Sequence, residues 1–450
     1  RVPLPSPPVS SLRAGPDLAF DSLRTASPAV TRFLASAVTV PLCESTAASP
    51  LVAELVEFAA ACRLDFGGAY VDEDPPPRAN IISGMWIFKL KRSPGSPPVF
   101  KARYVARGFS QRQGVDFFHT FSPTPKMTTL RVLLHVAVQR DYELHSLDFS
   151  TAFLQGSLHK EIWLRRPPGF TGSFPAGTQW SLRRPIYGLC QAPRKWHDTL
   201  TTTFATLGFA PSTADPSLFL RTNTTLPPFY VLVYIDDLVF ATADTEALAH
   251  VKSELQKRHT CTDLGELTSY LGLRITRTIT LTLSHMVQQV LQRFGFTYSS
   301  PQSTPLPTGH SLSAPPSEEF VEPSGPYPEL VGCLMYLMTC TRPNLAYPLS
   351  LLACYVAPGW HCKEHWDAAK RVLRYLCSTS GMGLVLGGRG RVVLSGLADT
   401  SWVDDLATHR SSQGYNFSLG SGSVSWRNTR SSSVLSSSCE AEIYAGAMAA

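Results

Sequence analysis

Apolar residues recur along the chain with two different periods, and these periods predict a mixed sequence of strands and helices. Two apolar runs that carry Lys and Arg flank a Pro- and Gly-rich turn over residues 85–109, which predicts a hairpin. Apolar residues with helical spacing follow over 126–141, and a strand pattern occupies 142–150. The same criteria predict a strand pair over 267–284 and helices over 51–64, 192–209, 244–258, 284–296 and 439–450.

Composition divides the chain into segments. Residues 1–50 are rich in Pro, Ser, Ala and Thr without a sustained period, which is typical of a disordered linker. Residues 299–326 form a second stretch rich in Pro and Ser, helical patterns dominate 327–379, and short strands with Gly and Ser follow from Gly381. Ser284 is expected to cap the helix that it begins. We therefore expect an α+β protein with more than one domain.

The most apolar strand pattern contains two adjacent acids. The uncharged run 229–235 leads directly into Asp236 and Asp237, after which apolar residues resume. Neighbouring residues of a regular strand point to opposite faces, so both acids serve one site only if the chain turns there. We therefore expect a tight hairpin with the acids at its tip. A second strand pattern, in "LHSLDFSTAFLQG", ends at another acid, Asp148.

Close carboxylates suggest a divalent cation. Two such groups repel each other, and burying them without compensation is unfavourable. Hard cations such as Mg²⁺ bind carboxylate and phosphate oxygens, and two metals about 3.5–4 Å apart stabilise the attacking and leaving oxygens of a phosphoryl transfer. The alternative is an ordinary Asp-rich turn in solvent, which is the better explanation for an isolated Asp-Asp pair.

Bulk properties exclude some classes of protein and leave others open. The 450 residues carry a formal net charge of +6, which permits a polyanionic partner without requiring one. No apolar run reaches about 18 residues, so no membrane span is expected. The ten cysteines contain no C-x-x-C pair, which favours reduced thiols over a zinc site or disulfides. Because the first residue is Arg1 and not Met, we expect a fragment or a product cut from a longer chain.

A series of short motifs runs in order from about residue 85 to the end of the chain. It comprises "WIFKLK", "KARYVARGFSQRQGVDFFHTFSP", "LDFSTAFLQG", "IYGLCQAPRKW", "YIDD", "DLGELTSYLG", "VGCLMYLMTCTRPNLAY", "VLRYLCSTSGMGL" and "SSSCEAEIY". "YIDD" alone is moderately specific, whereas the ordered set is very specific. In this set the chain resembles the reverse transcriptase region of a plant copia-type LTR retrotransposon polyprotein, with the beginning of RNase H.

The resemblance implies an α+β right-hand polymerase of fingers, palm and thumb, followed by a truncated RNase H-like α/β domain. The expected divisions are a disordered spacer with one short helix (1–66), fingers and palm (67–298), a linker (299–326), a helical thumb or connection (327–379) and the RNase H-like part (380–450). Near residues 65–70 the chain departs from the family pattern, and we expect an internal deletion there in a decayed copy.

The same resemblance assigns the acids. Asp148, Asp236 and Asp237 match the palm residues that bind two Mg²⁺ ions in this family, with Mn²⁺ as an alternative. Asp148 and Asp236 are expected to be the main ligands and Asp237 the supporting one. The backbone carbonyl of Phe149 is expected as a further ligand.

Four other residues match nucleotide-binding positions of the family. Phe153 corresponds to the aromatic residue under the incoming sugar, although "TAFL" also suits a core Phe. Gln191 corresponds to a glutamine near the nucleotide, and helix capping beside Pro193 is its structural alternative. Lys101 and Arg103 share a face of the basic hairpin and are expected to bind the triphosphate, the alternative being a solvated basic strand.

Two acids near the end of the chain match RNase H positions. Asp399 in "SGLADTSW" and Glu440 in "SSSCEAEIYAG" correspond to the first two catalytic carboxylates of that domain. A further Asp of the family lies beyond the last residue here, so we expect no useful RNase H activity.

The resemblance therefore implies an RNA-directed DNA polymerase that uses two metal ions. Its partners would be an RNA template, a DNA primer and deoxynucleoside triphosphates, without a membrane. The expected location is intracellular, in a cytoplasmic virus-like particle or the nucleus. The alternative function is a catalytically inactive relic that binds nucleic acid.

Overall fold

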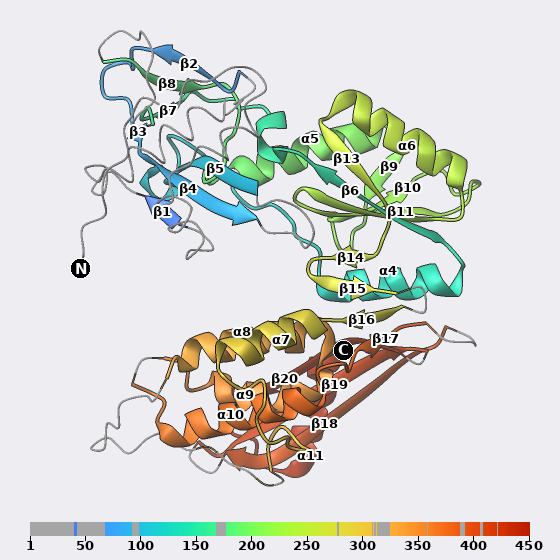
Figure 1. Ribbon diagram of the computed structural model, residues 1–450. Coiled ribbons are helices and arrows are strands. Elements are labelled where there is room, and N and C mark those ends of the chain that lie inside the picture. Colours follow the sequence, from blue (N-terminus) through green and yellow to red (C-terminus); the bar gives the residue numbers. More distant parts are fainter. Residues whose placement is uncertain are drawn as a thin grey trace. The chain divides into compact units, whose positions relative to one another are not determined.

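The computed structural model describes most of the chain and divides it into two compact units (Figure 1). The first unit comprises 1–124, 149–210 and 253–262, and the second comprises 125–148, 211–252 and 263–450. The described residues are 40–42, 68–91, 99–167, 177–276, 279–307, 309, 312, 325–357, 359–387, 392–405, 408–420 and 422–450, with side chains omitted for 40–42, 88–91 and 99–102. The helix predicted over 51–64 lies outside the described residues.

The first unit contains two small sheets with strand orders β1-β4-β5 and β2-β8-β7-β3. The predicted basic hairpin is confirmed as the antiparallel pair β4 and β5, and β1, from within the predicted spacer, pairs with β4. The elements are β1 (Val40–Leu42), β2 (Tyr70–Glu73), β3 (Ile81–Ile82), β4 (Gly84–Lys91), β5 (Val99–Ala106), η3 (Gly108–Ser110), η4 (Ala152–Gln155), β7 (Ile162–Leu164), β8 (Gln179–Leu182) and α5 (Ala192–Thr206).

Aromatic side chains form much of the core of the first unit. Tyr70 stacks on Trp180 with ring centroids 3.8 Å apart, and Tyr104 meets the same indole edge-on at 5.9 Å. Trp86 of β4 packs against Tyr104 of β5. The Tyr104 hydroxyl donates to the carbonyl of Arg165 at 2.9 Å, so this buried ring also satisfies its polar end.

The second unit is built on the sheet β13-β6-β12-β11-β10-β9 (Figure 1). The predicted helix over 126–141 is confirmed as α4, whose Leu130 and Leu134 share one core with Leu232 and Val239 of the sheet. The elements of this sheet and its helices are α4 (Met127–Gln139), β6 (Glu143–Phe149), β9 (Phe209–Pro211), β10 (Leu218–Arg221), β11 (Phe229–Tyr234), β12 (Asp237–Thr242), α6 (Thr245–Arg258) and β13 (Cys261–Glu266). The division between the units falls inside β6, β9, α6 and β13.

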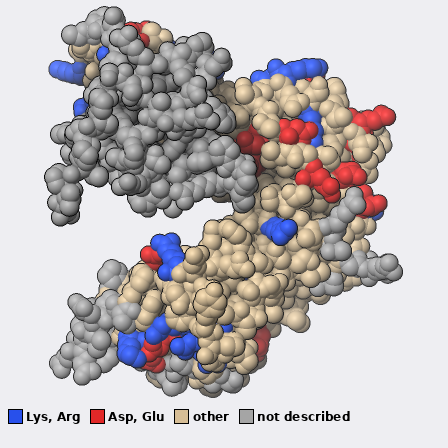
Figure 2. All heavy atoms as spheres, in the orientation of Figure 1, with Lys and Arg blue, Asp and Glu red and all other residues tan. Residues whose placement is uncertain are grey.

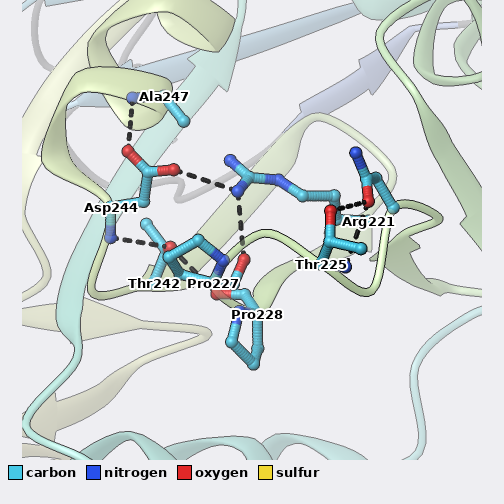
Figure 3. Close-up of polar contacts among 8 residues, drawn as sticks. Arg221, Thr225, Pro227, Pro228, Thr242, Asp244 and Ala247 are labelled. Carbon is cyan, nitrogen blue, oxygen red and sulfur yellow. Dashed lines mark hydrogen bonds and ion pairs between the residues drawn. The ribbon is translucent and has the colours of Figure 1, made fainter.

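Helix α6 is fixed to the sheet by buried or partly buried charges. Asp244 accepts a hydrogen bond from Ala247 N at the start of the helix and forms an ion pair with Arg221 (Figure 3). The Arg221 guanidinium also donates a hydrogen bond to Pro227 O (Figure 3). These bonds hold the pKa of Asp244 below its usual value. Further along, the buried Lys252 ammonium pairs with the Asp263 carboxylate at 2.7 Å. Hydrogen bonding thus determines where this helix begins.

The remainder of the second unit contains two further sheets and a group of helices. Their strand orders are β14-β15-β16-β17 and β18-β19-β20. The elements are β14 (Ser269–Tyr270), β15 (Leu273–Ile275), β16 (Thr280–Thr282), α7 (Ser284–Arg293), α8 (Tyr327–Thr341), η5 (Pro343–Leu345), α9 (Ala346–Ala353), α10 (Lys363–Ser378), β17 (Leu384–Val385), β18 (Leu394–Asp405), β19 (Arg410–Leu419), β20 (Gly422–Arg430) and α11 (Ser438–Ala449).

The α+β class predicted from the sequence is confirmed by this mixture of helices and sheets. Two local predictions are wrong. The strands after Gly381 are not all short, since β18 has 12 residues and β19 has 10. Ser284 does not cap α7, because Leu283 occupies the N-cap position and no side chain accepts a bond there.

Described basic side chains are scattered over one face of the protein (Figure 2), and the described helices have no membrane-spanning character. On the face shown in Figure 2, the described Lys and Arg side chains form small separate groups instead of one continuous basic surface. None of the helices in the described segments is both long and apolar enough to span a bilayer.

Candidate active site

Two carboxylates face each other at one end of the sheet in the second unit, and a third lies in the adjoining turn. Strand β12 pairs with β6 so that Asp237 lies directly opposite Asp148. The predicted hairpin is confirmed as β11 and β12, in which Tyr234 pairs with Asp237 and the turn consists of Ile235 and Asp236. Directly opposite residues of antiparallel strands project from the same face. The pairing of two distant chain segments therefore places Asp148 and Asp237 side by side, with Asp236 next to them in the turn.

The turn that carries Asp236 adopts a strained backbone conformation. Ile235 has a φ of 56°, in the left-handed region that β-branched residues rarely adopt. A positive φ at the first turn residue alone matches a type II′ turn, which joins two adjacent strands without splaying them. Such strain costs about 1–3 kcal/mol and concentrates at functional sites. This turn places Asp236 directly beside Asp237 at the end of the hairpin.

The carboxylates disturb one another electrostatically. Burial raises the pKa of Asp237 to about 6, and the negative charges of Asp236 and then Asp148 contribute to the same shift. A raised pKa means that the ionised form is disfavoured by its surroundings. The metal-free site therefore has unfavourable negative charge that a cation would relieve.

The donor atoms suit a hard divalent cation. Among the described residues, no three His, Cys, Asp or Glu side chains are grouped closely enough to enclose an ion by themselves. Mg²⁺ does not need such an enclosure, since one or two carboxylates together with waters and substrate phosphates are usual. The facing pair Asp148 and Asp237, with Asp236 beside it, therefore fits a metal that is shared with a phosphate-bearing substrate.

In the first unit, the structure places two predicted nucleotide-binding residues on one aromatic ring. The ring of Phe153 lies 4.7 Å from that of Tyr187, and the Arg103 guanidinium lies 5.0 Å from the Tyr187 centroid. Phe153 is only 7% exposed, so most of its surface serves the core, whereas Arg103 is exposed. Sequence reasoning missed Tyr187, although it belongs to the quoted motif "IYGLCQAP".

Tyr187 is held against β5 through its backbone. Ala106 N donates to the Tyr187 carbonyl at 2.9 Å. The next residue, Gly188, has a φ of +90°, and a Cβ there would lie 2.0 Å from the Ala106 carbonyl oxygen. Only glycine permits this approach. The "YG" pair thus positions the aromatic ring between Arg103 and Phe153.

Gln191 is buried, and each end of its side-chain amide makes a hydrogen bond within the protein. Its side-chain oxygen accepts from Gln111 Nε2 at 3.0 Å, and its amide nitrogen donates to the Asp116 carbonyl at 3.3 Å. Gln111 also accepts from Cys190 N at 2.7 Å. Gln191 occupies the N-cap position of α5, but its side chain accepts no capping bond. In the structure its amide therefore holds together the segment around Gln111 and Asp116.

Two other predicted residues lie in strands of this region. Lys101 lies in β5, but its side chain is outside the described residues. Phe149 ends β6, and its buried ring packs edge-on against Trp196 at 4.9 Å and against His259 at 5.6 Å. The Phe149 side chain is therefore part of a core, which leaves only its backbone carbonyl for the predicted ligand role.

The two acids that match RNase H positions have different surroundings, and the described cavity that Asp399 lines does not include Glu440. Asp399 lies in β18 opposite Gly414 and lines a cavity of about 250 Å³ with residues that include Tyr347 and Asn428. Glu440, in the first turn of α11, accepts hydrogen bonds from the backbone and hydroxyl of Ser436. These bonds lower the pKa of Glu440. Glu440 therefore stabilises the start of a helix in this structure.

Comparison with known proteins gives consistent matches. The family model described as reverse transcriptase (RNA-dependent DNA polymerase) matches residues 70–308. The chain is 34% identical over 394 residues to a retrovirus-related Pol polyprotein from transposon TNT 1-94 of Nicotiana tabacum, covering 85% of this chain and 29% of that protein. It is 36% identical over 373 residues to the corresponding polyprotein from transposon RE2 of Arabidopsis thaliana, covering 82% and 25%.

A shorter relative is covered almost completely. The putative transposon Ty5-1 protein of Saccharomyces cerevisiae is 31% identical over 295 residues, which cover 64% of this chain and 94% of that protein. The chain thus spans less than a third of the two plant polyproteins but nearly all of the yeast protein.

Proposed function

The chain belongs to the reverse transcriptase (RNA-dependent DNA polymerase) family, and we propose that it is the RNA-directed DNA polymerase of a retrotransposon. The observation that carries this proposal is the position of Asp148 directly opposite Asp237, with Asp236 in the adjoining turn. The proposed partners are an RNA template, a DNA primer and deoxynucleoside triphosphates. A virus-like particle or the nucleus is the proposed location.

In the proposed reaction, the 3′-hydroxyl oxygen of the primer bonds to the α-phosphorus of a deoxynucleoside triphosphate. The O–H bond of the hydroxyl and the bond from that phosphorus to its bridging oxygen both break, so that a proton and pyrophosphate leave. Two Mg²⁺ ions, or Mn²⁺ in their place, would stabilise the attacking and leaving oxygens when bound. Asp148 and Asp236 are proposed as the main metal ligands, with Asp237 and the Phe149 carbonyl in support.

We also propose that residues of the first unit bind the deoxynucleoside triphosphate. Arg103 is exposed and lies over the Tyr187 ring, and a guanidinium binds phosphate with two parallel hydrogen bonds. Lys101 in the same strand is proposed for the same triphosphate. Phe153 is proposed to lie under the sugar. Gln191 supports the proposal less directly, because both ends of its amide already bond within the protein.

We do not propose RNase H activity for this chain. A metal-dependent nuclease needs its carboxylates around one site. Asp399 lines a cavity that Glu440 does not line, and the Glu440 carboxylate is engaged by Ser436. Glu440 is therefore proposed to have a structural role here.

The proposed function is tested by primer extension on an RNA template. Purified protein should extend an annealed DNA primer with deoxynucleotides and Mg²⁺, and a chelator in excess of the metal should stop the reaction. Binding of the primer–template without any extension, under Mg²⁺ and under Mn²⁺, would instead favour the inactive nucleic-acid-binding relic.

Metal binding is expected to weaken at low pH. The pKa of Asp237 is raised to about 6 from 3.8, so most of this carboxyl is protonated at pH 5.5 in the metal-free protein. Because protonation competes with the metal, the affinity for Mg²⁺ should fall about fourfold between pH 7.5 and 5.5. Calorimetric titration at the two pH values measures this.

Through Asp237, a rise in pH is expected to lower the stability of the metal-free fold, whereas it raises the affinity for the metal. A carboxyl whose pKa is higher in the folded protein stabilises the metal-free fold fully below pH 3.8, and this contribution is lost as the pH rises through about 6. The control variant is Asp237→Asn, which should bind Mg²⁺ more weakly with little dependence on pH in this range. Equal affinities of the unmodified protein at both pH values would show that Asp237 does not titrate with the metal.

A further inference from the structure

Beside the carboxylates lies a second hairpin with a buried tyrosine. Strands β14 and β15 pair through Tyr270 and Leu273, and the turn between them is Leu271–Gly272. Both turn residues have positive φ, 48° and 75°, as a type I′ turn requires. The hydroxyl of Tyr336 in α8 donates a hydrogen bond to the Leu271 carbonyl at 2.8 Å, which stabilises the turn. Tyr270 is therefore held in a well-defined position.

The Tyr270 hydroxyl is a buried polar group that lacks a partner. The side chain is only 5% exposed, and its hydroxyl forms no hydrogen bond among the described residues. Leaving a buried hydroxyl unsatisfied costs about 1–3 kcal/mol, so natural proteins rarely retain one without a reason. A phenylalanine would fill the same space without this penalty.

The hydroxyl lies in the electrostatic field of the catalytic candidates. Tyr270 and Asp237 line the same cavity of about 290 Å³, together with Ser146 of β6 and Arg274 of β15. The pKa of Tyr270 is raised, first by burial and then by the charges of Asp237, Tyr234 and Asp236. A phenol that is kept protonated remains a hydrogen-bond donor.

We propose that Tyr270 is a positioning residue for Asp237: when a metal binds, its hydroxyl donates a hydrogen bond to the Asp237 carboxylate, which lines the same cavity. The proposal rests on the assignment of Asp237 to the metal site. One carboxylate oxygen then faces the cavity and the other is left for the metal. Partners of this kind orient metal ligands, and their loss typically reduces metal affinity or activity by about 10–100-fold.

Tyr270→Phe tests this role because it removes only the hydroxyl. We expect the apparent Kd for Mn²⁺, followed by the electron paramagnetic resonance signal of the free ion, to rise about tenfold. In primer extension, kcat should fall about tenfold, while the KM for the deoxynucleotide should stay within about twofold. The melting temperature of the metal-free variant should be unchanged or higher, since an unsatisfied hydroxyl has been removed.

Tyr327→Phe is the matched control in the same unit. Tyr327 is also fully buried, but its hydroxyl donates to the Leu352 carbonyl at 2.7 Å, and it does not line the Asp237 cavity. This variant should show the reverse pattern, with a lower melting temperature and unchanged Mn²⁺ affinity and kcat. A purely structural Tyr270 would lower stability without affecting metal affinity.

An unchanged Mn²⁺ affinity in Tyr270→Phe would overturn the proposal, whatever happens to the melting temperature. The proposal would also be overturned if the unmodified protein bound no Mn²⁺. If the protein binds Mn²⁺ but does not extend primers, the polymerase proposal fails, while the Mn²⁺ titration of the two variants still decides the role of Tyr270.

Discussion

Replacing Asp236 with Asn is expected to abolish primer extension on an RNA template, lowering kcat by about a thousandfold or more. Asn keeps the shape of the side chain but replaces a charged oxygen with a neutral amide, which Mg²⁺ binds poorly. The turn should survive, because Asn is well tolerated in tight turns. Steady-state primer extension with the purified variant gives the ratio of rates.

The other two carboxylates give a ranking that the same assay tests. Asp148→Asn should be as damaging as Asp236→Asn, and Asp237→Asn should be less damaging. Stability should not fall, because Asp236 and Asp148 both raise the pKa of Asp237 and removing either negative charge relieves that repulsion. Asp367→Asn, a surface residue of α10 paired with Lys363, is the control and should extend primers normally. Extension by Asp236→Asn within tenfold of the unmodified protein would remove the proposed mechanism.

Replacing Arg131 with Met is expected to destabilise the second unit by about 3 kcal/mol. Arg131 of α4 is 3% exposed, and its guanidinium donates to the carbonyls of Val424, Thr339 and Cys340. It also lies 3.8 Å from the centroid of the Trp426 ring. Met fills similar space but leaves three carbonyls without this donor. The midpoint of urea unfolding, with the slope held common, measures the loss.

The size of this effect reflects two opposing terms. Burial lowers the pKa of Arg131 to about 10, so the charged form is already disfavoured, but the group stays charged at neutral pH. Because the pKa is lowered on balance, the hydrogen bonds and the aromatic contact offset only part of the desolvation, and the expected loss on substitution comes mainly from the three carbonyls left without this donor. Arg410→Met, at an exposed position of β19, is the control and should change stability by no more than about 0.5 kcal/mol. A loss below about 1 kcal/mol for Arg131→Met would show that the carbonyls find other partners.

If Arg131 has this effect, the C-terminal sheet supports the polymerase-like part of the second unit. Arg131 joins α4 to the end of α8 and to β20. Trp426 Nε1 of β20 also donates to Met338 O of α8, and Gly387 N donates to His135 Nδ1 of α4. The C-terminal segment that contains β18, β19 and β20 is then a structural component of this unit.

Local sequence patterns predicted much of the fold and the family. The helical spacing of apolar residues located α4, and the apolar run broken by two acids located the β11–β12 hairpin. The motif series indicated a copia-type retrotransposon polyprotein, and the family model and the plant relatives confirm that resemblance. These features were predictable because each depends on residues that are close together in the sequence.

Other features depend on contacts that no local pattern encodes. The wrong prediction for Ser284 shows this on a small scale, since a residue with the right chemistry lies one position beyond the cap. Gln191 shows it on a larger scale, because its partners Gln111 and Asp116 lie far away in the sequence. Arg131 looked like an ordinary helical residue, yet it is bonded to residues more than 200 positions away.

The sequence by itself determined the chemistry that is available, namely three acids in strand-like surroundings and the family to which they belong. Only the tertiary structure decided that Asp148 and Asp237 lie opposite each other and that Tyr270 shares a cavity with Asp237. The reason is physical. Periodicity reports which face of an element is apolar, whereas the register between β6 and β12 depends on how distant apolar faces pack together. The residues of the site can thus be recognised in the sequence, but the packing that brings them together cannot be predicted from local sequence patterns.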